Sequence, residues 1–194
     1  MTRHDAIDRS DEFQVMTKTR CHRSVAGRPK KNIVPLSKLR TSEVMRTVVD
    51  HPHRLDELIA LLQDKERRIR GRAAVTLARL SESHPARLVR HLERLRGALA
   101  DDSAFVRWHL LYALGQVLAR FPGKAAGLLS DVGNRLADED RIVRVFACRA
   151  LEWLASRNPL IIIKLFEAKP GEMPPSLARM LQVTPPKAKG PAGS

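Results

Sequence analysis

The sequence predicts an all-α fold: an α-solenoid, or superhelix, of about three 37-residue helical hairpins with capping helices at both ends. The first reason is a fixed repeat, because Pro85, Pro122 and Pro159 follow one another at intervals of 37 residues. The second is that hydrophobic residues inside each interval keep the three- and four-residue spacing of amphipathic helices. The third is composition, since 43% of the residues are hydrophobic and only 4% are aromatic, which suits helices packed on helices.

The N-terminal residues 1–35 show no sustained helical period and are rich in Arg, Lys, Ser, Thr and Asp. We expect a basic, disordered segment there. Helical character begins near Ser37, where Leu36 and Val44 start a rough apolar stripe, and it ends before Pro52. This part of the chain predicts a degenerate half-repeat that caps one end of the solenoid.

Three full repeats follow, each with a first helix, A, and a second helix, B. The expected repeats span residues 52–84, 85–121 and 122–158. Their helix pairs are expected at 53–63 and 66–82, 85–100 and 103–119, and 122–137 and 140–156. Helix A turns inward Leu55, Leu58 and Leu62, then Leu92, Leu95 and Leu99, then Leu129, Val132 and Leu136. Helix B turns inward Ile69, Ala73, Leu77 and Leu80, then Val106, Leu110, Leu114 and Val117, then Val143, Ala147, Leu151 and Leu154.

The C-terminal end of the solenoid is expected to be covered by two shorter elements. These are the apolar segment Leu160–Phe166 and a short helix near Pro175–Leu181. The solenoid then spans residues 36–182. Residues 183–194 are rich in Pro, Lys, Ala and Gly, and we expect them to form a disordered basic tail.

Each B helix is preceded by an aspartate and carries an apolar residue followed by arginine in its first turn. The three sets are Asp64 with Ile69-Arg70, Asp101 with Val106-Arg107, and Asp138 with Val143-Arg144. Over residues 52–158 this pattern resembles the HEAT repeat family of armadillo-type solenoids. The aspartates stand where an N-cap or first-turn acid would stabilise a helix. The resemblance further implies that these aspartates and arginines form a ladder between neighbouring repeats, so we assign them to structure rather than to ligand binding.

The chain is strongly basic, with 35 Lys and Arg against 21 Asp and Glu and a formal net charge of +14. Much of this excess lies on the flanks, because residues 1–51 hold 11 basic and 6 acidic groups and residues 169–194 hold 4 and 1. Such a balance predicts an acidic protein partner or nucleic acid.

The cysteine count and the hydropathy pattern indicate a cytoplasmic protein. Cys21 and Cys148 do not make a disulfide framework, and Cys148 is expected in the core as a small hydrophobic residue. No apolar run follows the charged N-terminus as in a secretory signal. The most apolar stretch, Pro159 to Phe166, is too short to span a bilayer, so no membrane contact is expected.

The resemblance implies binding through the inner face that the B helices form. Opposite the buried stripe stand large amphipathic side chains and arginines, which is the composition of binding hot spots. The predicted contacts with a protein partner are Arg72, Arg79, Tyr112, Gln116, Arg149 and Trp153. The alternative for Trp108 and Trp153 is that they fill gaps between adjacent B helices.

Basic side chains also suggest nucleic-acid (DNA) binding through helices and tails as an alternative function. The candidate phosphate-binding residues are Arg28, Lys30, Lys31, Lys65, Arg67 and Arg68. The first three belong to Gly27-Arg28-Pro29-Lys30-Lys31, which resembles the core of an AT-hook, although Ala26 stands where that motif has a basic residue. Acidic residues such as Glu66 and Asp102 are interspersed, so a mixed solvated surface is the other interpretation.

Catalysis is not indicated by any motif. HEAT-repeat enzymes of the deoxyhypusine hydroxylase type use His-Glu pairs as iron ligands, and this sequence has no His-Glu dipeptide. The histidines show no zinc-site spacing, and neither a glycine-rich phosphate loop nor a nucleophile elbow is present. The sequence therefore predicts a monomeric, non-catalytic binding or scaffold protein without metal, cofactor or small-molecule substrate.

Overall fold

The computed structural model describes residues 34–167 and 170–182. Arg28, Lys30, Lys31, the predicted disordered N-terminal segment up to residue 33 and the predicted tail 183–194 therefore lie outside the described residues. Within the described ranges every element is a helix and none is a strand. The prediction of an all-α solenoid is confirmed.

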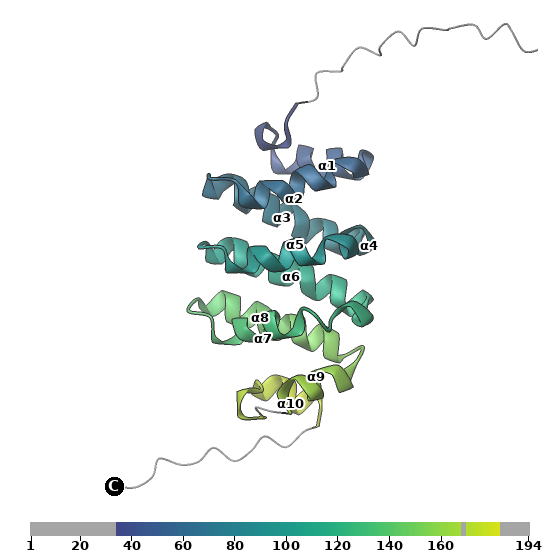
Figure 1. Cartoon of the computed structure of the whole chain (residues 1–194), viewed down its shortest axis with the longest axis vertical. Coiled ribbons are helices and arrows are strands. Elements are labelled where there is room, and N and C mark those ends of the chain that lie inside the picture. Colours follow the sequence, from purple (N-terminus) through teal and green to yellow (C-terminus); the bar gives the residue numbers. More distant parts are fainter. Residues whose placement is uncertain (1–33, 168–169, 183–194) are drawn as a thin grey trace, which may run out of the picture. The chain divides into compact units, whose positions relative to one another are not determined.

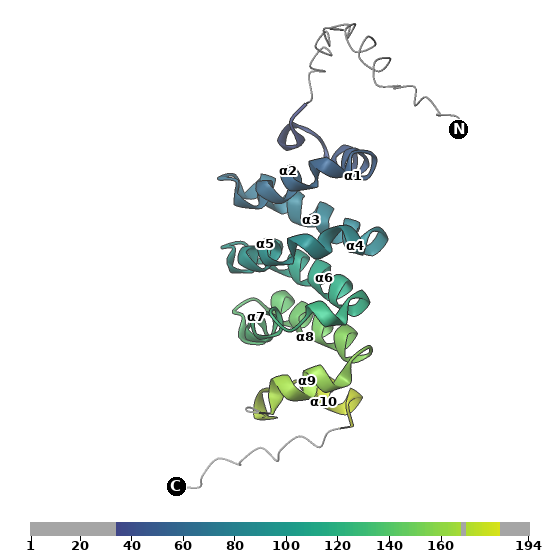
Figure 2. The ribbon, with the colours of Figure 1, turned by 45° about the vertical axis from the view of Figure 1, so that its right-hand side comes forward.

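The helices form hairpins that are stacked along one axis, with the A and B helices in two layers (Figure 1; Figure 2). The B helices are continuous: α3 (Arg67–Ser83), α6 (Ala104–Arg120) and α8 (Arg141–Ala155). The A helices are α2 (Leu55–Ala60), α4 (Pro85–Leu88) with α5 (Leu92–Gly97), and α7 (Leu129–Asn134). Helix α1 (Thr41–Asp50) precedes the first hairpin, and α9 (Pro159–Phe166) and α10 (Pro175–Met180) follow the third.

The A helices differ from the continuous helices that the pattern predicts. Short 3-10 turns flank or interrupt them at Pro52–Arg54, Leu61–Gln63, Val89–His91, Ala98–Ala100, Pro122–Lys124 and Arg135–Ala137. Two more lie at Leu36–Lys38 and Pro170–Glu172. The third A helix is the most broken, because Gly123 and Gly127 lie in its first half and glycine disfavours a helix by about 1 kcal/mol relative to alanine.

Pro52 and the prolines of the 37-residue repeat, Pro85, Pro122 and Pro159, each begin a helical segment, and the residue before each proline lies beyond the end of the preceding helix. His51, His84, Phe121 and Asn158 have ψ angles of 77°, 52°, 63° and 79°. These non-helical values follow from the clash between a proline ring and the residue before it. The proline itself is tolerated at the first helical position, where its missing N–H is not needed. The repeated proline therefore sets the position of each turn between hairpins.

The core is formed by the stripes that the sequence predicts. All twelve predicted B-helix positions and eight of the nine A-helix positions are buried, and Leu136 is half-buried against the same core. The prediction for Cys148 was wrong, because its side chain is half-buried rather than in the core. Its Sγ lies 3.3 Å from Ser176 Oγ of α10 and 3.5 Å from Glu152 Oε1. The thiol therefore faces the terminal cap.

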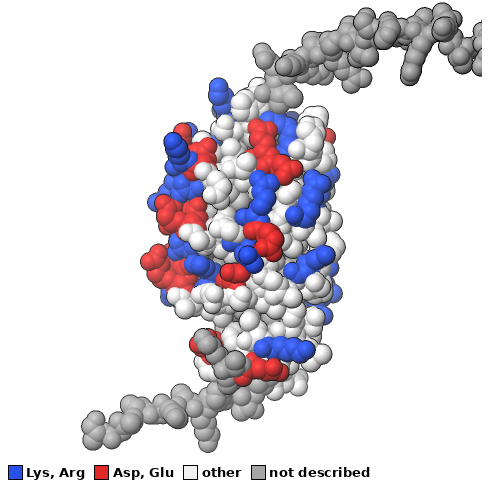
Figure 3. Space-filling view, viewed as in Figure 1, with Lys and Arg blue, Asp and Glu red and all other residues white. Residues whose placement is uncertain are grey.

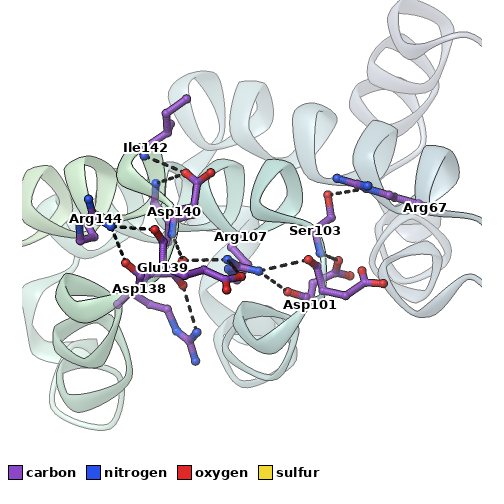
Figure 4. Close-up of polar contacts among 12 residues, drawn as sticks. Arg67, Asp101, Ser103, Arg107, Asp138, Glu139, Asp140, Ile142 and Arg144 are labelled. Atoms are coloured by element: carbon purple, nitrogen blue, oxygen red, sulfur yellow. Dashed lines mark hydrogen bonds and ion pairs between the residues drawn. The ribbon is translucent and has the colours of Figure 1, made fainter.

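Arginine–aspartate pairs join neighbouring repeats at the A–B turns (Figure 4). Arg70 Nε lies 2.7 Å from Asp101 Oδ2, and Arg107 Nη2 lies 2.7 Å from Asp138 Oδ1. Each arginine also donates to the carbonyl of the aspartate that precedes its own helix, Asp64 for Arg70 and Asp101 for Arg107. We call this part of the molecule the turn edge. The ladder that the family resemblance implies is present for both of these pairs.

The aspartates of the turn edge do not cap the B helices, contrary to the sequence-based expectation. Asp64, Asp101 and Asp138 each accept a hydrogen bond from the backbone N–H two residues further on. That residue, rather than the aspartate, is the N-cap of the helix. Each aspartate therefore shapes the turn before its helix, and the carboxylates of Asp101 and Asp138 are directed at the arginine of the preceding repeat.

Candidate binding surface

The side of α3, α6 and α8 that faces away from the A helices is the candidate surface, and we call it the B-helix face. It carries Arg72, Val75 and Arg79 of α3, then Trp108, Tyr112 and Gln116 of α6, then Val145, Phe146, Arg149 and Trp153 of α8. Arg79, Val145 and Arg149 are exposed, and the others are half-buried. All six predicted partner-binding residues lie on this face.

Six rings form a continuous row across α6 and α8, which we call the aromatic row: Phe105, His109, Trp108, Phe146, Tyr112 and Trp153. Trp108 stacks on Phe146 of the next helix with ring centroids 4.9 Å apart. Tyr112 meets both Phe146 and Trp153 edge to face, at 6.0 and 5.3 Å. Edge-to-face and offset-stacked pairs are the favoured geometries for aromatic rings. Trp108 therefore does fill a gap between B helices, and it also keeps part of its surface open to solvent.

Gly115 allows α6 and α8 to approach closely beneath the aromatic row. A Cβ atom at this position would lie 2.7 Å from the Trp153 ring and 2.9 Å from the Cα of Ala150. The backbone atom cannot move aside as a flexible side chain can. The position of Trp153 on the B-helix face thus depends on the absence of a side chain at residue 115.

His109 is part of the aromatic row in its neutral form. Burial lowers the pKa of its imidazole, and nearby Arg79 lowers it further. Its Nδ1 donates a hydrogen bond of 2.7 Å to the carbonyl of Phe105, which assigns the proton to that nitrogen. The ring stacks on Trp108 with centroids 3.4 Å apart. His109 therefore acts as a flat, uncharged filler.

Tyr112 joins the aromatic row to the neighbouring B helix. Its hydroxyl donates a hydrogen bond of 2.6 Å to Glu82 Oε1 at the C-terminal end of α3. This bond, together with burial, raises the pKa of the phenol above its usual value. The hydroxyl is thus a fixed neutral donor, and the apolar edge of the ring remains for a partner.

The predicted arginines of the B-helix face fall into two groups. Arg72 is committed within the chain, because its guanidinium donates to the carbonyls of Leu39 and Ser37 and so holds the start of α1. Arg79 and Arg149 form no hydrogen bond or ion pair with another described residue, although Arg149 lies over the Trp153 ring at 5.9 Å. Such a position is typical of a cation–π contact. Arg79 and Arg149 are therefore free to meet an anionic group.

The predicted phosphate-binding residues of the solenoid, Lys65, Arg67 and Arg68, lie at the start of α3. They too fall into a paired and an unpaired group. Arg67 Nε donates to Ser103 Oγ of the next repeat at 3.0 Å, whereas Lys65 and Arg68 are exposed and unpaired among the described residues. On the A helices, Arg87 binds backbone carbonyls, and Arg94 pairs with Asp56 at 2.8 Å. Much of the basic stripe is thus engaged inside the protein.

Figure 3 shows one face of the molecule, on which basic and acidic side chains lie next to one another along the edge that carries the A–B turns in Figure 1. Close oppositely charged pairs leave little net potential for a phosphate backbone to follow. The described residues hold no group of three or more His, Cys, Asp or Glu of the kind that binds a metal ion. In the same ranges, no helix has the length and apolar character needed to cross a membrane.

Sequence reasoning missed two exposed apolar side chains, Phe105 and Ile142, at the N-terminal ends of the B helices. They are 46% and 52% exposed. The 37-residue register contains the signal, because Phe105 and Ile142 occupy equivalent positions and Arg68 stands at that position in the first repeat. The helical period alone assigns these residues to no buried stripe, and they therefore extend the apolar part of the candidate surface.

No protein-family model matches this chain, and no curated protein sequence matches it. Among solved structures, the chain is similar to a designed armadillo repeat protein in complex with the peptide (KR)4, with a TM-score of 0.51 and 17% sequence identity. The similarity covers 76% of this chain and 68% of the designed protein. At this level of identity it concerns the fold alone, which is an α-solenoid of armadillo or HEAT-like type.

Proposed function

We propose that this chain is a non-catalytic HEAT-repeat protein whose B-helix face binds an acidic segment of a protein partner. The observation that supports this most directly is the aromatic row with an unpaired arginine on each side, Arg79 on α3 and Arg149 on α8. Half-buried aromatic rings beside arginine are the residue types that dominate binding energy at protein interfaces. The repeated aspartates and arginines of the turn edge support the HEAT-type assignment.

The sign of the partner's charge follows from which charged side chains on the B-helix face are unpaired. Arg79 and Arg149 are unpaired among the described residues, while the carboxylate of Glu82 already accepts from Tyr112. A segment with carboxylates beside apolar side chains would therefore find both cations and rings available. The similar designed protein was solved with a basic peptide. The surface here calls for a ligand of the opposite charge.

The proposal is tested by fluorescence anisotropy with three labelled probes: a peptide of alternating glutamate and leucine, a peptide of the same length with lysine in place of glutamate, and a DNA duplex. The glutamate peptide is expected to bind, and the lysine peptide is not. Arg79→Glu combined with Arg149→Glu should weaken binding of the glutamate peptide by about tenfold or more, because two attractive contacts become repulsive. Tyr112→Ala combined with Trp153→Ala should abolish it.

The matched control is Lys124→Glu combined with Lys164→Glu, which changes the net charge equally on exposed residues outside the B helices. This control should bind as the wild type does, and circular dichroism should show unchanged helicity in every variant. An equal loss of affinity in the control would mean that only overall charge matters. Tight duplex binding that falls steeply with salt, with no binding of the glutamate peptide, would refute the proposal and favour nucleic acid.

A further inference from the structure

One junction between B helices is open where the next is filled. In the 37-residue register, Gly71 of α3 corresponds to Trp108 of α6, and Val75 corresponds to Tyr112. Trp108 and Tyr112 both pack on Phe146 and so cover the α6–α8 junction. The α3–α6 junction has no comparable rings from α3, because glycine has no side chain and valine is short.

The space left at this junction is an open groove of about 740 Å³ between α1, α3 and α6, within the range of ligand sites. We call it the α3–α6 groove. It is lined by Thr41, Arg67, Arg68, Gly71, Arg72, Val75, Ser103 and Phe105. No aspartate or glutamate is among these residues, so the lining combines an apolar floor with arginines at the rim.

Two of the three arginines hold the walls of the α3–α6 groove in place. Arg72 donates to the carbonyls of Ser37 and Leu39 and thereby fixes the segment that leads into α1. Arg67 donates to Ser103, the N-cap of α6. Arg68 makes no hydrogen bond or ion pair with another described residue and is exposed. The groove is therefore preformed, with one arginine left for a ligand.

The floor of the α3–α6 groove is available to an aromatic ring. Phe105 is 46% exposed, and its ring atoms lie 3.3 Å from where a Cβ of Gly71 would be. The Phe105 ring packs on Trp108 and His109 on one side, with centroids 5.7 and 4.3 Å apart. The Phe105 ring itself packs against Gly71, so a ligand ring in the groove would lie on the exposed side of Phe105 and extend the aromatic row by one member toward α3.

We infer that the α3–α6 groove anchors an aromatic side chain of the acidic partner segment, with a flanking carboxylate at Arg68. The inference rests on the proposed function and deepens it by naming the anchor. The partner's ring would pack on Phe105 beside Val75 and so fill the junction that no ring of α3 fills. The cationic rim without a carboxylate selects an acidic rather than a basic sequence around that ring.

The test uses labelled peptides of alternating glutamate and alanine in which a single phenylalanine replaces each alanine in turn. Phenylalanine at one position should tighten binding to the wild-type chain by about tenfold or more relative to the all-alanine peptide, because burying the ring removes its surface from water. Gly71→Trp, which fills the groove from within, should remove that gain. It should leave binding of the glutamate–leucine peptide to Tyr112 and Trp153 in place.

Arg68→Glu provides a second variant that leaves the packing untouched, and Arg141→Glu is its matched control at the exposed first residue of α8. The gain in affinity that phenylalanine brings should fall in Arg68→Glu and stay unchanged in Arg141→Glu. If the glutamate–leucine peptide binds but no phenylalanine position brings a gain, the anchor is wrong and the proposed function stands. If no acidic peptide binds, both fail. Displacement of the phenylalanine peptide by single-stranded DNA at lower concentration than by unlabelled peptide would overturn the inference in favour of nucleic-acid bases.

Discussion

The turn edge and the B-helix face use the same 37-residue register in opposite ways. At the turn edge each repeat carries the same residue types, so that Arg70 pairs with Asp101 just as Arg107 pairs with Asp138. On the B-helix face equivalent positions differ, and glycine, tryptophan and valine stand at residues 71, 108 and 145. One region is uniform, with arginines and aspartates paired to each other. The other is varied, with exposed rings and unpaired arginines.

This difference separates the residues that hold adjoining repeats together from the residues that are not required for stacking. In a solenoid each repeat touches only its neighbours, so the same interface must be built each time. A residue that supports that interface is therefore expected to recur, as Asp101 and Asp138 do. Stacking does not dictate side chains that face away from the neighbouring hairpin. Gly71 and Trp108 differ at equivalent junctions, so a ring of the chain fills the α6–α8 junction while the α3–α6 junction is left open.

The largest effect expected at the turn edge comes from Arg107→Met. The Arg107 and Asp138 side chains are 6% and 3% exposed, so the substitution leaves a buried carboxylate without its main partner. A loss of about 3–5 kcal/mol in the free energy of unfolding is expected. Urea unfolding followed by circular dichroism measures it.

Arg144→Met is the matched control for that change. Arg144 donates to the backbone carbonyls of Asp138 and Glu139, at 2.7 and 2.9 Å, and ion-pairs with no carboxylate among the described residues. Its loss is expected to be smaller, about 1–2 kcal/mol. Equal losses for the two variants would contradict the view that the ladder pair, rather than the arginine as such, holds adjoining repeats together.

The next effect concerns a place where the B-helix face depends on close packing, at Gly115. Gly115→Ala puts a Cβ against Ala150 and Trp153 and should cost about 1–3 kcal/mol through overpacking. Trp153 should become more exposed, with its fluorescence emission shifted to longer wavelength. Gly97→Ala is the control, because no atom lies within 4 Å of its added Cβ. That variant should gain about 0.4–1 kcal/mol by restricting the unfolded chain.

Acid should weaken the turn edge below about pH 4. Burial alone would raise the pKa of Asp138, but hydrogen bonds from Arg107, the Asp140 backbone and Arg135 outweigh burial, and the folded pKa lies below its ordinary value. A carboxylate with a depressed pKa stabilises the fold above its unfolded pKa, about 3.9, and loses that contribution as the pH falls through its folded pKa. Unfolding free energy should therefore fall more steeply below about pH 4 in the wild type than in Asp138→Asn. Parallel pH profiles would exclude this role for Asp138.

The smallest effect on stability is expected on the B-helix face itself. Arg79→Glu and Arg149→Glu change exposed side chains without ion-pair partners in the described part of the chain. Each should alter the free energy of unfolding by no more than about 0.5 kcal/mol. Thermal melts of the single variants measure this. A large loss would show that these arginines support the fold and would remove them from the proposed interface.

The fold could be predicted because the features that determine it, the buried stripes and the turns, depend on residues close together in the sequence. The buried stripes depend on a helical period, and the turns depend on the restriction that each proline places on the residue before it. The half-buried position of Cys148 could not be predicted, since it depends on how α10 packs on α8, whereas the glycines that break the third A helix can be read from the sequence. The same limit applies to Asp101 and Asp138, whose carboxylates are directed at the preceding repeat rather than at their own helix.

The candidate surface was predicted as a set of positions, without the state of each side chain. Helical phase placed Tyr112, Arg149 and Trp153 on one face, and the structure brings two of their rings into contact. Helical phase could not show that Arg72 holds the start of α1 while Arg79 stays free, because the Arg72 contacts join segments more than 30 residues apart. Nor could helical phase show the α3–α6 groove, because three helices form it.

Periodicity alone determined that this protein is a stack of helical hairpins with a hydrophobic core, because the spacing of apolar residues along one helix is fixed by the sequence. Only the tertiary structure decided which charged side chains are paired within the protein and which aromatic rings remain exposed. That outcome depends on distances between residues of different repeats. The Gly71 position shows the division well: its place in the repeat can be counted from the sequence, and the space above it exists only once α1, α3 and α6 have packed.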